Sequence, residues 1–248
     1  MRIQPGWRVA LMVLLLYNAI VFGTWAAFGA DYRYLSSAEN ALTQLLLPMG
    51  LGTLLVTLAV TWLGWWRPAT TETLARPAAR WPLWALSAAM LALSAANLAA
   101  VPWAALAPAH VLMLITACAL VGFNEELVTR GVVLTCLRGA GVGEAGVWFW
   151  SCLLFGAMHV PNALFGMPLA AGVLQGTLAF VMGGALYALR RTSGALWLPM
   201  ALHGLWDFSS LCLKASGGAS AYAVYCQFAT YLLAIAAVPA LLRRRTSA

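Results

Sequence analysis

Charged residues are scarce in this chain of 248 residues: Asp, Glu, Lys and Arg make up 8% of it, where a soluble domain has about 25%. Hydrophobic residues make up 63%, and the mean hydropathy is +0.85. This balance excludes an ordinary soluble protein and predicts an integral membrane protein. The net charge of +7 does not indicate a nucleic-acid partner, because the basic residues are dispersed at the ends of apolar runs. We therefore expect the lipid bilayer, and no nucleic acid, as a partner.

Patterns typical of metal and serine-nucleophile sites are also missing. The five cysteines lie in apolar runs without a CxxC pair, and no HExxH is present. We expect the cysteines to pack as small apolar side chains, and we expect no metal and no cofactor. Zinc held by a glutamate and two histidines is the alternative. Neither Ser151 nor Ser209 lies in a GxSx-type setting, which disfavours a serine protease.

Long apolar runs are abundant. A membrane-spanning helix needs about 20 apolar residues, and continuous runs of this length predict helices, since an open sheet cannot lie in lipid. The sequence predicts an all-α, polytopic transmembrane helical bundle of about eight spans. Their approximate bounds are 9–30, 42–65, 82–101, 108–137, 147–164, 168–189, 194–213 and 221–242.

The basic residues predict the orientation of these spans. If the N-terminus is cytoplasmic, eleven of the fourteen Lys and Arg residues fall on the cytoplasmic side, two (Arg33 and Lys214) fall outside, and Arg130 lies within a span. Cytoplasmic links carry an excess of Lys and Arg, so we expect both termini in the cytoplasm. The eleven are Arg2, Arg8, Arg67, Arg76, Arg80, Arg138, Arg190, Arg191, Arg243, Arg244 and Arg245.

Two adjacent glutamates lie deep in the fourth run. Ionisable groups at membrane depth are expensive and mark functional sites. On a helix Glu126 and Arg130 are four residues apart and share one face, so we expect an ion pair. Glu125 points about 100° away from this pair, which leaves it as the freer carboxylate. The alternatives are that both glutamates only face a polar helix interior, or that the run ends near Gly122 and leaves them at the surface.

Two histidines lie deep in later runs. His159 follows Phe155 by four residues near the middle of the fifth span, and His203 precedes Asp207 by four residues in the seventh. Residues four apart project to one side of a helix. Ionisable groups on three spans at similar depth predict one shared cavity, although a packing role for each histidine is the alternative. His110, near the start of the fourth run, is expected to be structural.

The ordered motifs Glu125-Glu126…Arg130, Phe155…His159 and His203…Asp207 resemble the CPBP family of intramembrane glutamic endopeptidases, also called Abi or type II CaaX-prenyl-protease-like proteins. The resemblance covers roughly residues 108–210. It implies a single membrane domain over 1–248, with peripheral spans in 1–105, a catalytic core at about 108–213 and a last span at 221–242. It also implies a multi-pass protein of the bacterial cytoplasmic (inner) membrane.

The resemblance implies peptide hydrolysis without a metal, on a membrane-embedded or lipidated peptide or protein substrate. Glu125 would activate a water with the help of His159, and His203 with the residue four later would stabilise the oxyanion. Glu126, Arg130 and Phe155 would support them. The family has Asn at the last position in its prenyl-processing members, whereas this chain has Asp207, so either the carboxyl is protonated or it orients His203. A non-catalytic immunity or binding protein of the same fold and a proton-coupled transporter are the alternative functions. The sequence leaves the oligomeric state open.

Overall fold

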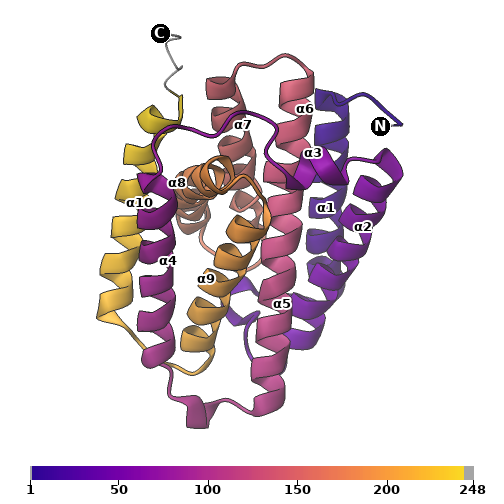
Figure 1. Ribbon diagram of the computed structural model, residues 1–248. Helices are drawn as coiled ribbons and strands as arrows, with labels where there is room; N and C mark the ends of the chain where they lie inside the picture. Colours follow the sequence, from indigo (N-terminus) through magenta and orange to yellow (C-terminus); the bar gives the residue numbers. More distant parts are fainter. Residues whose placement is uncertain (1, 243–248) are drawn as a thin grey trace.

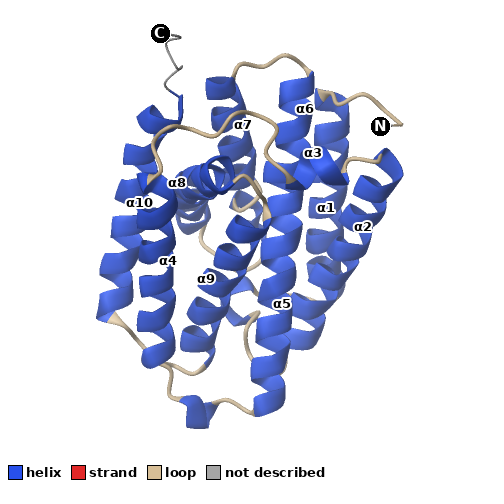
Figure 2. Ribbon diagram, in the orientation of Figure 1, coloured by secondary structure: helices blue, strands red, loops and turns tan. Residues whose placement is uncertain are grey.

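The computed structural model describes residues 2–242, and within them it contains helices and connecting turns but no β-strand (Figure 2). The prediction of an all-α bundle is confirmed. In chain order the elements are the helix α1 (Trp7–Ala27), the 3-10 helix η1 (Tyr32–Tyr34), the π-helix η2 (Ala41–Leu46), α2 (Leu47–Leu63), α3 (Trp66–Thr70), α4 (Trp81–Ala99), η3 (Trp103–Ala105), α5 (Pro108–Glu126), the π-helix η4 (Leu127–Val133), α6 (Leu134–Gly139), α7 (Glu144–Ala157), η5 (Val160–Leu164), α8 (Leu169–Ser193), α9 (Trp197–Ala215) and α10 (Ala221–Leu242).

Seven helical segments of the described residues are long and apolar enough to cross a membrane, which confirms a polytopic bundle. The sequence predicted about eight. The predicted span that falls outside this set is the seventh, which corresponds to α9, a helix of 19 residues. Its polar residues, among them His203, Asp207 and Lys214, lower its hydropathy. The helix that carries part of the candidate site is therefore the least lipid-like of the eight.

Most of the long helices run side by side along the bundle, whereas α8 is seen nearly end-on (Figure 1). The pair α1 and α2 lies at one side and the pair α4 and α10 at the other, with α5 and α9 between them. Helix α7 packs against α8, which in turn packs against α10. Helices α5 and α9 also pack closely against each other, so the side chains between them are buried while their outer faces remain exposed.

Two glycines allow α5 and α9 to approach closely. A Cβ atom added at Gly122 would lie 2.3 Å from the carbonyl oxygen of Met200, and one added at Gly204 would lie 2.8 Å from that of Cys118. No larger residue fits such an approach without moving the backbone. Gly122 precedes the glutamate pair and Gly204 follows His203, so this contact brings the two motifs together.

The helix that carries the glutamates changes its winding directly after them. Residues Leu127–Val133 form the π-helix η4, after which α6 continues the same rod to Gly139. π-Helical turns inside α-helices are rare and are frequent at functional sites. The predicted fourth span, 108–137, agrees with the observed rod to within two residues, but no residue pattern in it indicated this altered turn.

His159 lies at a helix end rather than near the middle of a span, which corrects that prediction. Helix α7 ends at Ala157, and His159 directly precedes the 3-10 helix η5. Proline cannot continue a helix without losing a backbone hydrogen bond, and Pro161 follows His159 by two residues. The break turns the His159 side chain toward the bundle interior instead of along α7.

The two ends of the bundle are formed by different segments of the chain. At the termini end, α1 begins, α10 ends, and the link 71–80 crosses from α3 to α4 (Figure 1). At the opposite end lie the link between α1 and α2 and the C-terminal end of α9, where Lys214 Nζ stands 5.8 Å from the ring centre of Tyr32. The predicted cytoplasmic residues Arg243, Arg244 and Arg245 lie outside the described residues.

Candidate functional site

Glu126 and Arg130 form the expected ion pair, and it is fully buried. Arg130 Nη1 donates to Glu126 Oε1 over 2.8 Å, and both side chains are 0% exposed. The glutamates therefore do not lie at the protein surface, which removes that alternative. His203 Nδ1 stands 3.2 Å from the same Glu126 oxygen. A buried charge is tolerated only when it is paired and hydrogen-bonded, and here one oxygen of Glu126 contacts both Arg130 and His203 and so joins α5 to α9.

The other ring nitrogen of His203 faces two further carboxylates. Nε2 lies 3.9 Å from Glu125 Oε2 and 3.5 Å from Asp207 Oδ2. Both separations are longer than an ordinary hydrogen bond, so Nε2–H remains able to donate to a group placed between them. Glu125 Oε2 is buried without a hydrogen-bond partner among the described residues. Glu125 is thus the freer of the two glutamates, as the sequence indicated.

His159 is oriented by its own turn of backbone. Its Nδ1 lies 2.8 Å from the carbonyl oxygen of Phe155. A carbonyl can only accept, so Nδ1 carries the proton and Nε2 of the neutral ring is an acceptor. The side chain lines the same cavity as Glu125. This is the arrangement that a base or a water-holding acceptor requires.

The ring of Phe155 contacts Arg130 and both histidines of the site. The Arg130 guanidinium lies 4.0 Å from the ring centre, in a cation–π contact. The ring also meets His159 and His203 edge to face, with centroids 5.0 and 5.7 Å apart. The buried Phe155 ring therefore packs against the guanidinium and both imidazoles and limits the positions that they can take.

A single cavity of about 290 Å³ brings the four predicted catalytic residues together. Glu125 comes from α5, His159 from the turn after α7, and His203 and Asp207 from α9. The other lining residues are Tyr17, Asn18, Val21, Phe22, Trp25, Tyr32, Leu35, Ser36, Leu45, Met49, Val121, Met158, Asn162, Gln175, Ser210, Leu211 and Lys214.

Sequence reasoning missed several polar residues of this lining. Asn162 donates to Gln175 Oε1 over 2.9 Å, and Gln175 Nε2 donates to the Tyr32 hydroxyl. Tyr17 and Asn18 of α1 also line the cavity, although α1 was assigned to the peripheral spans. Isolated amides and tyrosines give no motif. The one available signal was that Asn162 and Gln175 fall within or beside apolar runs.

His110 is structural, as expected. It is buried, and its Nε2 lies 2.9 Å from the carbonyl oxygen of Ser36. The hydrogen bond ties the start of α5 to the link after α1. Within the described residues, no cluster of three or more His, Cys, Asp or Glu has the arrangement of a metal site. The described cysteines are all free, and Cys226 alone among them is not buried.

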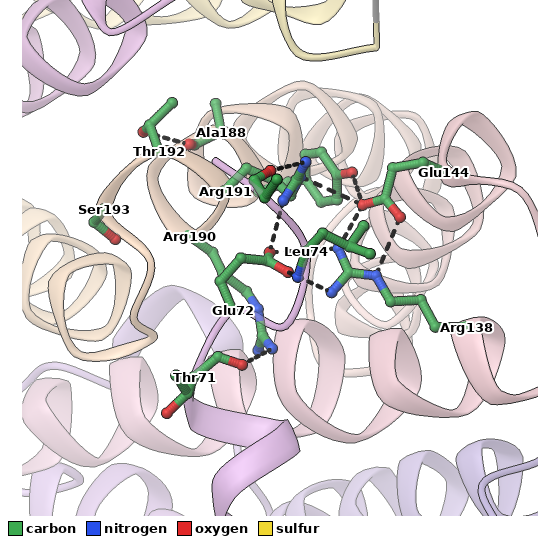
Figure 3. A network of polar contacts seen from close by, with 12 residues as sticks. Thr71, Glu72, Leu74, Arg138, Glu144, Ala188, Arg190, Arg191, Thr192 and Ser193 are labelled. Carbon is green, nitrogen blue, oxygen red and sulfur yellow. Dashed lines mark hydrogen bonds and ion pairs between the residues drawn. The ribbon is translucent and has the colours of Figure 1, made fainter. Parts of the chain in front are cut away.

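The termini end of the site is covered by a network of charges (Figure 3). Arg138 donates to Glu72 over 2.8 Å and to Glu144 over 2.5 Å, and Arg191 lies within 3.5 Å of the same two carboxylates. Burial alone would raise the pKa of Glu72, but the charge and hydrogen bonds of Arg138, with Arg191 and the amide of Leu74, hold that pKa below its usual value. We call these four residues, with Arg190, the charged seal.

Arg190 connects the charged seal to the helical rod that carries Glu125. It is 0% exposed, and its guanidinium donates to the carbonyl oxygens of Ala69, Arg130, Pro68 and Thr71. The Arg130 carbonyl belongs to the π-helix η4. The sequence analysis counted Arg190 as a cytoplasmic charge. The structure shows that it is a buried clamp between the link after α3 and the helix that carries Glu125.

Residues 106–209 match the family described as type II CAAX prenyl endopeptidase Rce1-like. The matched segment runs from just before α5 into α9 and contains Glu125, His159, His203 and Asp207. The match confirms the resemblance drawn from the motifs: the chain carries an Rce1-like domain, of a family of membrane proteases, in a multi-pass membrane protein. Comparison with curated proteins and with solved structures gave no match.

Proposed function

We propose that this Rce1-like domain is an intramembrane endopeptidase that hydrolyses a peptide bond in a membrane-anchored or lipidated protein of a bacterial cytoplasmic membrane. The observation that carries the proposal is the convergence of Glu125, His159, His203 and Asp207 on one cavity of about 290 Å³. Hydrolysis requires a base, an attacking water and a donor for the oxyanion, and this cavity supplies a candidate residue for each role.

Glu125 is the proposed general base. Its Oε2 has no hydrogen-bond partner among the described residues and faces the cavity. It takes a proton from the attacking water, whose oxygen then bonds to the carbonyl carbon of the substrate. The neutral His159 helps to hold this water by accepting at Nε2, because Nδ1 is already bonded to the Phe155 carbonyl.

His203 is the proposed oxyanion donor. Glu126 fixes the ring through Nδ1, at 3.2 Å, so that Nε2–H points into the cavity. The carbonyl oxygen of the substrate becomes negative as water attacks, and a donor already in place stabilises it without reorganisation. The protonated Glu125 then gives its proton to the leaving amide nitrogen, the C–N bond breaks, and both products are neutralised without another reactant.

Asp207 is proposed to act through His203. Its carboxylate stands 3.5 Å from Nε2, and an ionised carboxylate would repel an oxyanion directly. As a neighbour of the imidazole, however, it favours the charged ring that donates best. Glu126, Arg130 and Phe155 are proposed as positioning residues that do not line the cavity. Glu126 and Phe155 contact His203, and Arg130 holds both Glu126 and Phe155.

The experiment compares membrane peptides by mass spectrometry from cells that express the protein and from cells that express Glu125→Gln. This change keeps the shape of the side chain and removes the base, so we expect cleavage products to fall by roughly 10²-fold to 10⁴-fold. Glu144→Gln is the matched control, since it removes a carboxylate of the charged seal that lies outside the cavity. Equal product from Glu125→Gln and the unaltered protein would refute the mechanism.

A further inference from the structure

The cavity extends from the middle of the bundle toward the end away from the termini. Its α1 residues start at Tyr17, at the midpoint of that helix, and its α9 residues run from His203 toward the C-terminal end at Lys214. Tyr32, Leu35 and Ser36 come from the link that joins α1 to α2 at the opposite end. Along α9 the lining extends about 16 Å, at about 1.5 Å per residue.

Exposure rises along this path. The side chain of Glu126 is 0% exposed, that of His203 6%, that of Glu125 13% and that of Asp207 30%. Lys214, at the far end of the lining, is an exposed residue. The catalytic groups are therefore reached from the Lys214 end of α9, and the route narrows toward Glu126.

The termini end offers no comparable route. There the buried Glu126–Arg130 pair lies behind the site, and Arg190 fastens the link after α3 to the Arg130 carbonyl. Beyond it Glu72 and Glu144 are held by Arg138 and Arg191 (Figure 3). Opening a path here would separate one fully buried and several partly buried ion pairs and leave their charges unpaired, which is unfavourable.

The charge of the two ends gives the direction across the membrane. Besides the charged seal, the termini end carries Arg2, Arg8, Arg67, Arg76 and Arg80. At the opposite end Asp31 is paired with Arg33 over 2.5 Å, and its hydrogen bonds from Arg33 lower the pKa of Asp31 to about 2. With Glu39 and Lys214 added, that end has no net charge. An excess of Lys and Arg marks the cytoplasmic side.

We infer that the cavity opens to the non-cytoplasmic face, and that the substrate is a peptide segment on that face, such as the membrane-proximal part of an exported protein held by a membrane or lipid anchor. The inference rests on the proposed function for the cleavage, but its direction of access rests on the geometry and the charges alone. It disfavours a tail that is presented from the cytosol.

The side of the membrane to which the cavity opens is tested by labelling single cysteines in intact cells with a membrane-impermeant maleimide. The reporters are Glu39→Cys, in the link near the cavity, and Thr73→Cys, in the link over the charged seal; both positions are exposed. Cys226→Ser serves as the background, because the other cysteines are buried. We expect Glu39→Cys to react in intact cells and Thr73→Cys to react only after permeabilisation. The reverse pattern, or equal reaction of both, overturns the inference.

Access is tested with a quenched fluorogenic peptide library that carries sulfonated dyes and cannot cross a bilayer. It is added to sealed vesicles of either orientation, with Glu125→Gln as the blank. We expect cleavage only in vesicles that expose the Glu39 side, and cleavage from the Thr73 side overturns the inference. If neither orientation exceeds the blank, the proposed peptidase activity fails, while the labelling still decides which way the cavity faces.

Discussion

Buried carboxylates are paired with arginines at one end of the bundle and are left partly unpaired in the cavity toward the other end. At the termini end, the carboxylates of Glu72 and Glu144 are matched by Arg138 and Arg191, so that charge serves to hold helices and a link together. In the cavity toward the other end, Glu125 Oε2 has no hydrogen-bond partner among the described residues. A carboxylate whose two oxygens are both paired stabilises a fold, whereas an unpaired carboxylate oxygen beside a cavity is available to a substrate or water. The difference separates a structural region from the proposed catalytic one.

The boundary between the two regions is the pair Glu126 and Arg130, and breaking it has the largest expected effect. Glu126→Leu leaves the guanidinium uncompensated in the interior and should lower the free energy of unfolding by about 3–5 kcal/mol. The double variant Glu126→Leu/Arg130→Met removes both charges and should recover much of that loss. Thermal unfolding in detergent measures both. A double variant no more stable than the single one would contradict the view that the stranded charge dominates.

Arg190 and Arg191, which are adjacent in α8, allow a direct comparison of how much each side chain of the charged seal contributes to stability. Lysine cannot span the four carbonyl groups that Arg190 reaches. Arg190→Lys should therefore cost about 2 kcal/mol or more, because buried carbonyls lose their donors. Arg191→Lys keeps a cation near Glu72 and Glu144 and should cost less than about 1 kcal/mol. Chemical denaturation of the two variants measures the two losses in the free energy of unfolding. Equal losses would show that the carbonyl contacts of Arg190 contribute no more than the ion pairs of Arg191.

Lowering the pH should destabilise the folded protein through the charged seal at the termini end. The pKa of Glu72 in the folded protein lies below its usual value of 4.5. Its contribution to stability is therefore fully present above about pH 4.5 and is lost as the pH falls through the folded pKa. Stability measured between pH 7 and pH 3 should fall more steeply for the unaltered protein than for Glu72→Gln, which has no carboxyl to protonate. Parallel curves would show that another group governs the acid transition.

The smallest effect on folding is expected in the cavity, at Asp207. Asp207→Asn is nearly isosteric, and the side chain is 30% exposed, so unfolding should change little. Cleavage should fall by roughly tenfold, equivalent to about 1.4 kcal/mol in the barrier, because His203 loses a neighbouring negative charge. Rates measured on the folded fraction test this. Activity that is retained or raised would indicate that an amide donates directly to the oxyanion.

Much of this architecture follows from local sequence. Apolar run length predicted the helices to within a few residues, because hydropathy reflects the solvent around each segment. The pairs Glu126–Arg130 and His203–Asp207 followed from helical spacing, and the ordered motifs indicated the joint site. The match over residues 106–209 confirms the family that those motifs suggested.

What the sequence did not predict depends on contacts between distant residues. Arg190 looks like any arginine at a helix end, and only its approach to the Arg130 carbonyl, 60 residues away, reveals the clamp. The closeness of Gly122 and Gly204 likewise belongs to neither helix alone. The polar lining from Tyr32, Asn162 and Gln175 arises from three separate segments. Local patterns carry no information on such pairings.

The π-helical turn Leu127–Val133 has a consequence for how this protein tolerates insertions and deletions. A π-turn holds more residues than an α-turn, so loss of one residue there would let the rod wind as a regular α-helix. The residues after the deletion would keep nearly the same faces, because the extra residue is accommodated within the π-turn. A residue lost between Leu134 and Arg138, in the regular helix α6, would instead rotate Arg138 by about 100° about the axis and away from Glu72. The π-turn is therefore the part of this rod where a change of length does least harm.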